Sequence, residues 1–266
     1  MIGPHEDSQH SIRIPYVSMK LWYLHQTRPA ERILTKMIDS NQKPKNTQEN
    51  FLIYASSHYV EYRERAARAL SEIGTIHTAG KCQGNFEAHP PPKPDASPEQ
   101  CEPFEDGIRP PSILPLPGSF GRDKQGQNLN TFSTYRFSLV MENTAAPGYV
   151  SEKILDAFLA GSMPIYFGSR LVLDIFNPKT FIFFDPENPQ QALSEIQYLE
   201  QNPIEYRKKL NEPIITNMEM FERYFSWDET VGNGSLKQRI RQMMGLQGDD
   251  PISASRNAHK EQSPTP

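Results

Sequence analysis

Two turns of the sequence gather side chains that could bind a phosphorylated ligand. The first runs from Glu142 to Lys153 (ENTAAPGYVSEK) and surrounds the expected start of one helix with Asn143, Tyr149, Glu152 and Lys153. These side chains offer an amide, an aromatic ring, a carboxylate and a cation, and a nucleotide diphosphate sugar needs all four. The second turn, Ser56 to Arg63, precedes another expected helix. Because free amides and the helix dipole favour anions at a helix N-terminus, both turns are candidate phosphate sites.

The same side chains also have a structural interpretation. Glu152 would favour the positive end of the helix dipole, Lys153 would be solvated, and Tyr149 would pack against its neighbours. Composition alone favours this interpretation, so the choice depends on the surrounding pattern.

Alternating strand and helix patterns surround both turns. Residues 51–56 (FLIYAS) predict a strand and residues 61–73 a helix, and the strand at 135–141 is followed by a helix over about 150–160 that Gly161 ends. Further strands are predicted at 75–78, 163–167 and 180–184, and further helices at 190–201, 204–210 and 218–224. This alternation predicts right-handed βαβ units and an α/β fold with a doubly wound parallel sheet.

Two segments contrast with this pattern. Residues 82–118 are rich in proline and predict an extended surface insertion, and residues 245–266 predict a disordered tail. Cys82 and Cys101 flank the proline-rich part, and they could form a disulfide or remain two unrelated thiols.

Several classes of function are disfavoured. The net charge of −4 argues against nucleic acid or an anionic membrane as the main partner. The chain has no G-x-G-x-x-G, residues 74–82 miss the P-loop pattern, and the His and Cys residues show no metal-ligand spacing. The longest apolar stretch, 157–168, is interrupted and shorter than a membrane span. The first ten residues lack the features of a signal peptide.

The run from Tyr135 to Ser169 resembles the donor-binding signature of the alpha-1,3-fucosyltransferases, glycosyltransferase family ten. The family's Phe-Glu-Asn-Ser corresponds to residues 141–144 (MENT), and its Tyr-Val-Thr-Glu-Lys corresponds to residues 149–153 (YVSEK). Its Ala-Gly-x-x-Pro-x-x-x-Gly corresponds to residues 160–168. Upstream, residues 51–70 resemble the family's strand, turn and arginine-bearing helix, and Arg63 falls on the arginine that contacts the donor phosphates.

This resemblance implies a GT-B architecture of two facing Rossmann-like halves. Residues 48–244 would form the C-terminal, GDP-fucose-binding half, and residues 1–47 would be a remnant of the acceptor domain and its linker. The family implies inversion at the fucose anomeric carbon, GDP-fucose as donor and no obligatory metal or other cofactor. Arg63 and Lys153 would neutralise the diphosphate in place of a metal ion.

The remaining candidates receive roles from the same resemblance. Glu152 would accept hydrogen bonds from the ribose, and Asn143 and Tyr149 would orient the nucleotide. Glu142 would either contact the donor or act structurally. A general base is not identifiable, because the family takes it from the acceptor domain.

Three functions therefore stay open. We expect an inverting fucosyltransferase that acts on a glycan or glycoprotein and is present here as an incomplete fragment. The alternatives are a non-catalytic GDP-sugar-binding module and a transferase that uses another GDP-sugar. The family further implies the lumenal side of the Golgi membrane, reached through an anchor that this sequence lacks. There a Cys82–Cys101 bridge and glycosylation at Asn233 would be plausible.

Overall fold

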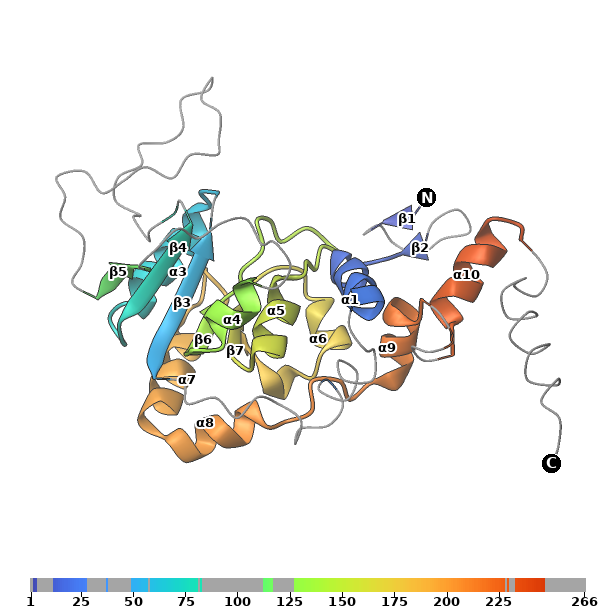
Figure 1. Ribbon diagram of the computed structural model, residues 1–266. Coiled ribbons are helices and arrows are strands. Elements are labelled where there is room, and N and C mark those ends of the chain that lie inside the picture. Colours follow the sequence, from blue (N-terminus) through green and yellow to red (C-terminus); the bar gives the residue numbers. More distant parts are fainter. Residues whose placement is uncertain are drawn as a thin grey trace, which may run out of the picture.

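The centre of the protein is a six-stranded sheet in the order β5-β4-β3-β6-β7-β8, and all neighbouring strands are parallel (Figure 1). The computed structural model describes residues 2–3, 12–27, 37, 49–56, 58–80, 82, 112–116, 127–227, 229 and 233–246. The strands are β3 (Asn50–Ser56), β4 (Ile76–Gly80), β5 (Ile113–Pro115), β6 (Tyr135–Leu139), β7 (Met163–Tyr166) and β8 (Ile182–Phe183). The predicted α/β fold with a parallel sheet is confirmed.

Helices cover both faces of the sheet, because each strand is apolar on both sides. On β3, Leu52 and Tyr54 join one buried cluster and Ile53 joins the other. The first face is covered by α3 (Glu61–Leu70), α7 (Gln190–Gln201) and α8 (Pro203–Leu210). The second is covered by α4 (Gln127–Phe132), α5 (Lys153–Ala160) and α6 (Val172–Ile175), and a 3₁₀ turn, η3 (Pro178–Thr180), leads into β8. The sheet is doubly wound.

A group of elements from the two ends of the described chain lies beside the sheet, on the side away from β5 (Figure 1). It comprises β1 (Ile2–Gly3) and β2 (Ile12–Arg13), which pair in parallel, with α1 (Tyr16–Thr27), α9 (Met218–Phe225) and α10 (Ser235–Met243). The Ser18 hydroxyl donates a hydrogen bond to the Tyr224 carbonyl and so links α1 to α9. The Lys20 ammonium lies 3.5 Å from the buried Asp156 carboxylate and so links α1 to α5. These contacts hold α1 against α5 and α9.

The predicted helix at 150–160 begins later than expected. Helix α5 starts at Lys153, although its predicted apolar residues, from Val150 to Leu159, are all buried. The Val150 carbonyl accepts a hydrogen bond from the Val17 amide at 2.9 Å, and the Ser151 amide bonds to the Glu142 side chain. Contacts with distant parts of the chain thus replace the first turn of helix.

The prediction of a surface insertion over 82–118 is wrong at its C-terminal end, because residues 113–115 form β5. Ile113 is fully buried and pairs with Ile76, so this segment belongs to the sheet. Strand β5 is an edge strand, where Pro115 with its missing N–H is tolerated. Cys82 is buried and disulfide-bonded, whereas Cys101 and the other residues of the predicted insertion lie outside the described residues. Most of the predicted tail, 247–266, also lies outside them, and helix α10 just before it was not predicted.

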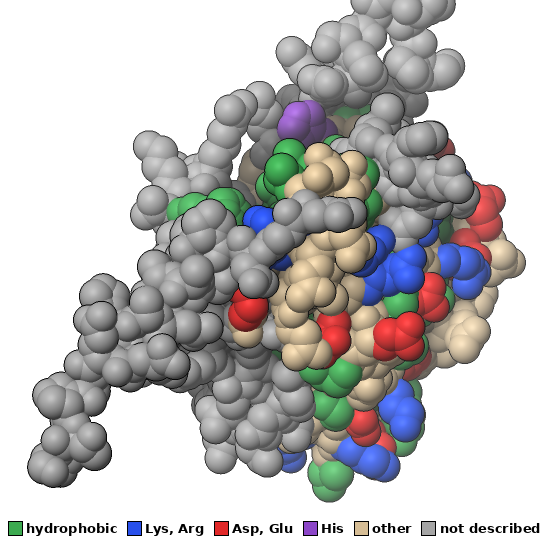
Figure 2. All heavy atoms as spheres, turned by 90° about the vertical axis from the view of Figure 1, so that its right-hand side faces the viewer, with side chains coloured by type: hydrophobic (Ala, Val, Ile, Leu, Met, Phe, Trp, Pro, Cys, Tyr) green, Lys and Arg blue, Asp and Glu red, His purple; other side chains and the backbone are tan. Residues whose placement is uncertain are grey.

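The surface seen in Figure 2 has charges of both signs. Acidic and basic side chains lie next to one another on this face, without a broad field of either sign. In the part of the chain that the structure describes, no helix is both long and apolar enough to cross a membrane.

Gly161 ends α5 in the left-handed conformation, with φ 77° and ψ 18°. A side chain costs about 1 to 2 kcal/mol in this conformation, so we expect Gly161→Ala to lower the free energy of unfolding by about that amount. Urea denaturation would measure the change. The matched control is Gly245→Ala, since Gly245 has a similar φ of 70° but follows the terminal helix α10 and has no atom near its missing side chain. Because both glycines have a positive φ, both variants should lose stability, and no loss in Gly161→Ala would contradict the argument from backbone strain.

Candidate functional site

The two candidate turns meet because β3 and β6 are neighbouring parallel strands, with Tyr54 paired to Leu139. Their carboxyl ends therefore open on the same edge of the sheet, where α/β proteins bind ligands. The Arg63 guanidinium, from the first turn of α3, donates to the Asn143 side-chain oxygen at 2.8 Å. Two residues that are 80 positions apart thus form one site.

Arg63 is a buried cation that presents a donor without a partner. It is 4% exposed, and its guanidinium also donates to the His58 carbonyl. Its Nε atom is buried without a hydrogen bond, and none of the described carboxylates forms an ion pair with Arg63. Because a buried charge is costly unless it is paired, an anionic ligand at this position would complete the environment of Arg63.

Glu142 is buried completely and organises the start of α5. Its carboxylate accepts hydrogen bonds from the Ser151 amide at 2.6 Å and from the Ser151 hydroxyl at 2.7 Å. The Lys153 ammonium lies 2.9 Å from the same carboxylate and forms an ion pair with it. Of the two roles expected for Glu142, these contacts support the structural one, because the carboxylate faces protein groups rather than solvent.

Lys153 is held at the edge of the site by this ion pair. Its ammonium also lies 3.1 Å from the Ser151 hydroxyl, and its side chain remains 28% exposed. A ligand can therefore reach the ammonium, although Glu142 balances its charge. The structural interpretation expected a solvated Lys153, and the structure shows a partly exposed side chain that is also paired with a buried carboxylate.

Tyr149 and Glu152 lie on the same turn, each partly exposed. The Tyr149 ring packs edge-on against the Tyr16 ring of α1, with 5.4 Å between ring centroids. Burial, followed by the nearby charges of Glu142 and Glu152, raises the pKa of the Tyr149 phenol. The Glu152 carboxylate caps no amide of α5. Glu152 nevertheless stands at the N-cap position of α5, where its charge favours the positive end of the helix dipole, so both the structural and the ligand-binding interpretation of Glu152 stay open.

Two residues of the site were not identified from the sequence. The Tyr62 hydroxyl donates to the Glu142 carbonyl, and Tyr62 is the residue immediately before Arg63 in the first turn of α3. Ser169 is buried, and its hydroxyl oxygen accepts hydrogen bonds from the Gly148 amide at 3.0 Å and the Leu171 amide at 3.3 Å. Ser169 directly follows the last glycine of the 160–168 pattern, which was the available signal for this residue.

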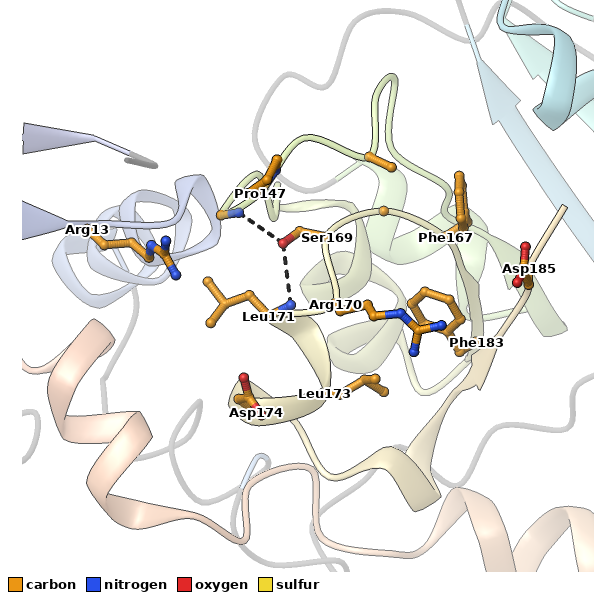
Figure 3. Close-up of a pocket in the computed structure, with 13 residues that line it drawn as sticks. Arg13, Pro147, Phe167, Ser169, Arg170, Leu171, Leu173, Asp174, Phe183 and Asp185 are labelled. Atoms are coloured by element: carbon orange, nitrogen blue, oxygen red, sulfur yellow. Dashed lines mark hydrogen bonds between the residues drawn. The ribbon is translucent and has the colours of Figure 1, made fainter. Parts of the chain in front are cut away.

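A pocket of about 710 Å³ opens beside these turns (Figure 3). It is bounded by the 145–148 turn, the loop after β7, the end of β8 and Arg13. Its lining residues are Arg13, Ala145, Pro147, Gly148, Phe167, Gly168, Ser169, Arg170, Leu171, Leu173, Asp174, Phe183 and Asp185. The Arg170 guanidinium lies over the Phe183 ring, 5.3 Å from its centroid. The pocket neighbours the Glu142–Lys153 turn without including Arg63 or Lys153.

Gly168 leaves the space that the Glu142 side chain occupies. A Cβ atom at this position would lie 2.6 Å from Glu142 Cγ and 2.6 Å from the Tyr166 hydroxyl oxygen. We expect Gly168→Ala to lower the free energy of unfolding by about 1 to 3 kcal/mol, measured by urea denaturation. Adding Tyr166→Phe removes one of the two clashing atoms and should restore part of the loss. No recovery in the double variant would argue against this packing.

The Tyr62 phenol makes the free energy of unfolding depend on pH in the alkaline range. Burial raises the pKa of Tyr62 to about 12, whereas tyrosines of an unfolded chain titrate near 10. The folded protein thus holds this proton more tightly, and the resulting stability is complete below about pH 10 and lost as the pH rises through about 12. Tyr62→Phe should make the alkaline fall in the free energy of unfolding less steep, as measured by urea denaturation at increasing pH. Tyr198→Phe, at an exposed position outside the site, should leave the steepness unchanged, and an equal effect of both variants would contradict the assignment.

Comparison with protein-family models relates this site to known proteins. Residues 43–211, more than half of the chain, match the C-terminal domain of glycosyltransferase family 10 (fucosyltransferase). All six predicted site residues fall within the matched range.

Curated relatives match over shorter regions. The alpha-(1,3)-fucosyltransferase FucT of Helicobacter pylori is 41% identical over 107 residues, which cover 38% of this chain and 22% of the relative. The alpha-(1,4)-fucosyltransferase of Arabidopsis thaliana is 27% identical over 167 residues, which cover 61% of this chain and 37% of the relative. The chain thus spans less than half the length of these relatives.

Solved structures of an alpha1,3-fucosyltransferase share the fold. The structure with GDP-fucose matches with a TM-score of 0.57 at 19% identity, covering 94% of this chain and 70% of that chain. The structure with GDP matches with a TM-score of 0.52 at 21% identity, covering 81% and 61%. The predicted GT-B type fold is confirmed by these matches.

Proposed function

We propose that this chain, which belongs to glycosyltransferase family 10, the fucosyltransferases, binds GDP-fucose and serves the transfer of fucose to a glycan hydroxyl. The hydrogen bond between Arg63 and Asn143 is the observation that carries the proposal. It joins the two candidate phosphate turns at one edge of the sheet and gives them a buried cation with an unpartnered donor. The presence of GDP-fucose in the related solved structure supports the same ligand.

Each site residue then has a chemical role in binding the donor. Departure of GDP leaves a diphosphate charge, which the Arg63 guanidinium and the Lys153 ammonium neutralise without an obligatory metal ion. The accessible Glu152 carboxylate accepts hydrogen bonds from the ribose, and Asn143 and Tyr149 orient the nucleotide. Glu142 holds Lys153 and Ser151 in position from within the protein.

The reaction also requires groups that this proposal does not assign. A base must remove the proton of the acceptor hydroxyl as the bond from its oxygen to the fucose anomeric carbon forms and GDP leaves. In the family this base comes from the acceptor domain, and the matched region is the C-terminal domain. Removal of the acceptor proton therefore depends on that other half.

The compartment is part of the same proposal. The disulfide at Cys82 fits an oxidising compartment, such as the Golgi lumen that the family resemblance implies.

Calorimetric titration of the full chain tests the donor site. We expect saturable binding of GDP-fucose, and weaker binding of GDP-mannose and UDP-glucose. A chelator of divalent metals should leave the affinity for GDP-fucose unchanged. Removing Lys153 alone would leave the buried Glu142 carboxylate unpaired, so the variant is Lys153→Met combined with Glu142→Gln. The affinity of this double variant for GDP-fucose should be about 10- to 100-fold lower than that of the wild type, since a hydrogen bond to a charged group is worth about 1.5 to 3 kcal/mol.

Two further measurements make the result specific. Lys208→Met, at an exposed lysine outside the site, should bind GDP-fucose as the wild type does. No binding by a chain whose fold is verified by circular dichroism would refute the donor site. Equal affinity for GDP-mannose would instead indicate another GDP-sugar, and tight binding without transfer to any glycan would indicate a non-catalytic module.

A further inference from the structure

The pocket in Figure 3 lies next to the proposed donor site but on different strands. Arg63 and Asn143 stand over the ends of β3 and β6, whereas Phe167 and Phe183 line the pocket at the ends of β7 and β8. In the sheet these strands follow one another as β3-β6-β7-β8. The turn between β6 and α5 borders both regions, so a second molecule in the pocket would lie beside the donor.

The walls of the pocket are fixed to one another. Ser169 is buried between the two loops, and its hydroxyl oxygen accepts from the Gly148 amide on one side and the Leu171 amide on the other (Figure 3). These bonds connect the turn after β6 to the loop after β7. A ligand would therefore enter a preformed cavity, which lowers the cost of ordering the site.

The polar groups of the pocket balance in charge. Arg13, Arg170, Asp174 and Asp185 line the pocket with two formal charges of each sign, so neither a strong anion nor a strong cation is favoured. With respect to the described residues, the Asp174 carboxylate and the Arg170 guanidinium form no hydrogen bond or ion pair. They can therefore accept from and donate to the hydroxyl groups of a neutral ligand.

The apolar groups of the pocket complement these hydrogen-bonding groups. Phe167, Leu171 and Leu173 can pack against the C–H face of a sugar ring. The charged side chains that line the same pocket can form hydrogen bonds with the hydroxyl groups of the sugar. The volume of about 710 Å³ lies within the range of small-molecule sites and accommodates more than one sugar ring.

We propose that this pocket binds a neutral sugar of the acceptor glycan, so that the donor-binding domain itself contributes an acceptor subsite. The inference rests on the proposed function, since a sugar in this pocket can be an acceptor only if the neighbouring site binds the donor. Asp174 and Arg170 are the specificity-determining residues of this subsite, and Ser169 keeps its walls in place.

Saturation-transfer NMR on the full chain, with lactose and N-acetyllactosamine as neutral probes, tests the subsite. Signal transfer to at least one probe is expected from the wild type, with and without GDP. Asp174→Ala and Arg170→Met alter exposed side chains and should leave the fold intact, as thermal unfolding would verify. Each substitution should lower the affinity for the probe about tenfold or more, because each removes a charged hydrogen-bonding group.

The matched control is Glu187→Ala, which removes an exposed carboxylate two positions beyond Asp185 that does not line the pocket. It should bind both probes as the wild type does. Absence of signal transfer from the wild type, or equal weakening by the control, would overturn the proposal.

Calorimetry with GDP and GDP-fucose separates this inference from the donor proposal. We expect Asp174→Ala and Arg170→Met to bind both nucleotides as the wild type does. If the two variants bind GDP-fucose more weakly than the wild type but bind GDP equally well, the pocket holds the hexose of the donor, and the acceptor assignment is wrong. If the wild type binds the sugar probes but not GDP, the donor site is refuted. The pocket would then be a sugar-binding site that is not an acceptor subsite.

Discussion

The arrangement of this site depends on one buried carboxylate. Glu142 lies just beyond the end of β6 with no exposed surface, and Ser151 and Lys153 supply it with an amide, a hydroxyl and an ammonium as partners. Those partners occupy the residues that lead into α5. The need to satisfy Glu142 therefore fixes where α5 begins and where the Lys153 side chain points.

The same constraint explains the space around the carboxylate. Tyr62 donates to the Glu142 carbonyl from α3, and Gly168 leaves room for the side chain from the loop after β7. Strands β3, β6 and β7 thus contribute to one packed unit, with Glu142 at its centre. This unit joins the proposed phosphate-binding edge to the neighbouring pocket, because the turn that it fixes forms a wall of both.

Local pattern was sufficient to predict much of the fold. Strand β3 is an uninterrupted apolar run, and α7 was predicted with the bounds that the structure has, because short polar segments flank its helical pattern. Strand β5 was missed since its three residues lie among prolines, and only pairing with β4 makes them a strand. Helix α10 was missed because its few apolar residues pack against other segments, as Leu236 does with Ile12 and Ile14.

The candidate site shows the same division between local and distant information. Arg63, Asn143 and Lys153 were candidates from their residue types and their places at helix starts, the family resemblance decided in their favour, and the structure brings them to one edge of the sheet. The role of Glu142 could not be found in this way, because a carboxylate next to a turn has the same local pattern whether it faces a ligand or a lysine. Burial favours the structural role, and the surroundings of Glu142 include residues from α3 and from the segment 166–168.

A division of charge along the sheet edge follows from these contacts. Lys153 has its charge balanced by Glu142, whereas Arg63 has hydrogen bonds but no ion pair with a described carboxylate, so the uncompensated positive charge lies over β3 and β6. The pocket beside the ends of β7 and β8 is lined by two arginines and two aspartates, so its formal charges sum to zero. A diphosphate is attracted to the first region and gains nothing from the second, whereas a neutral sugar can satisfy the second without competing for the first. In the two proposals made above, one sheet edge would thus hold a charged donor and a neutral acceptor sugar side by side, and electrostatics would separate them.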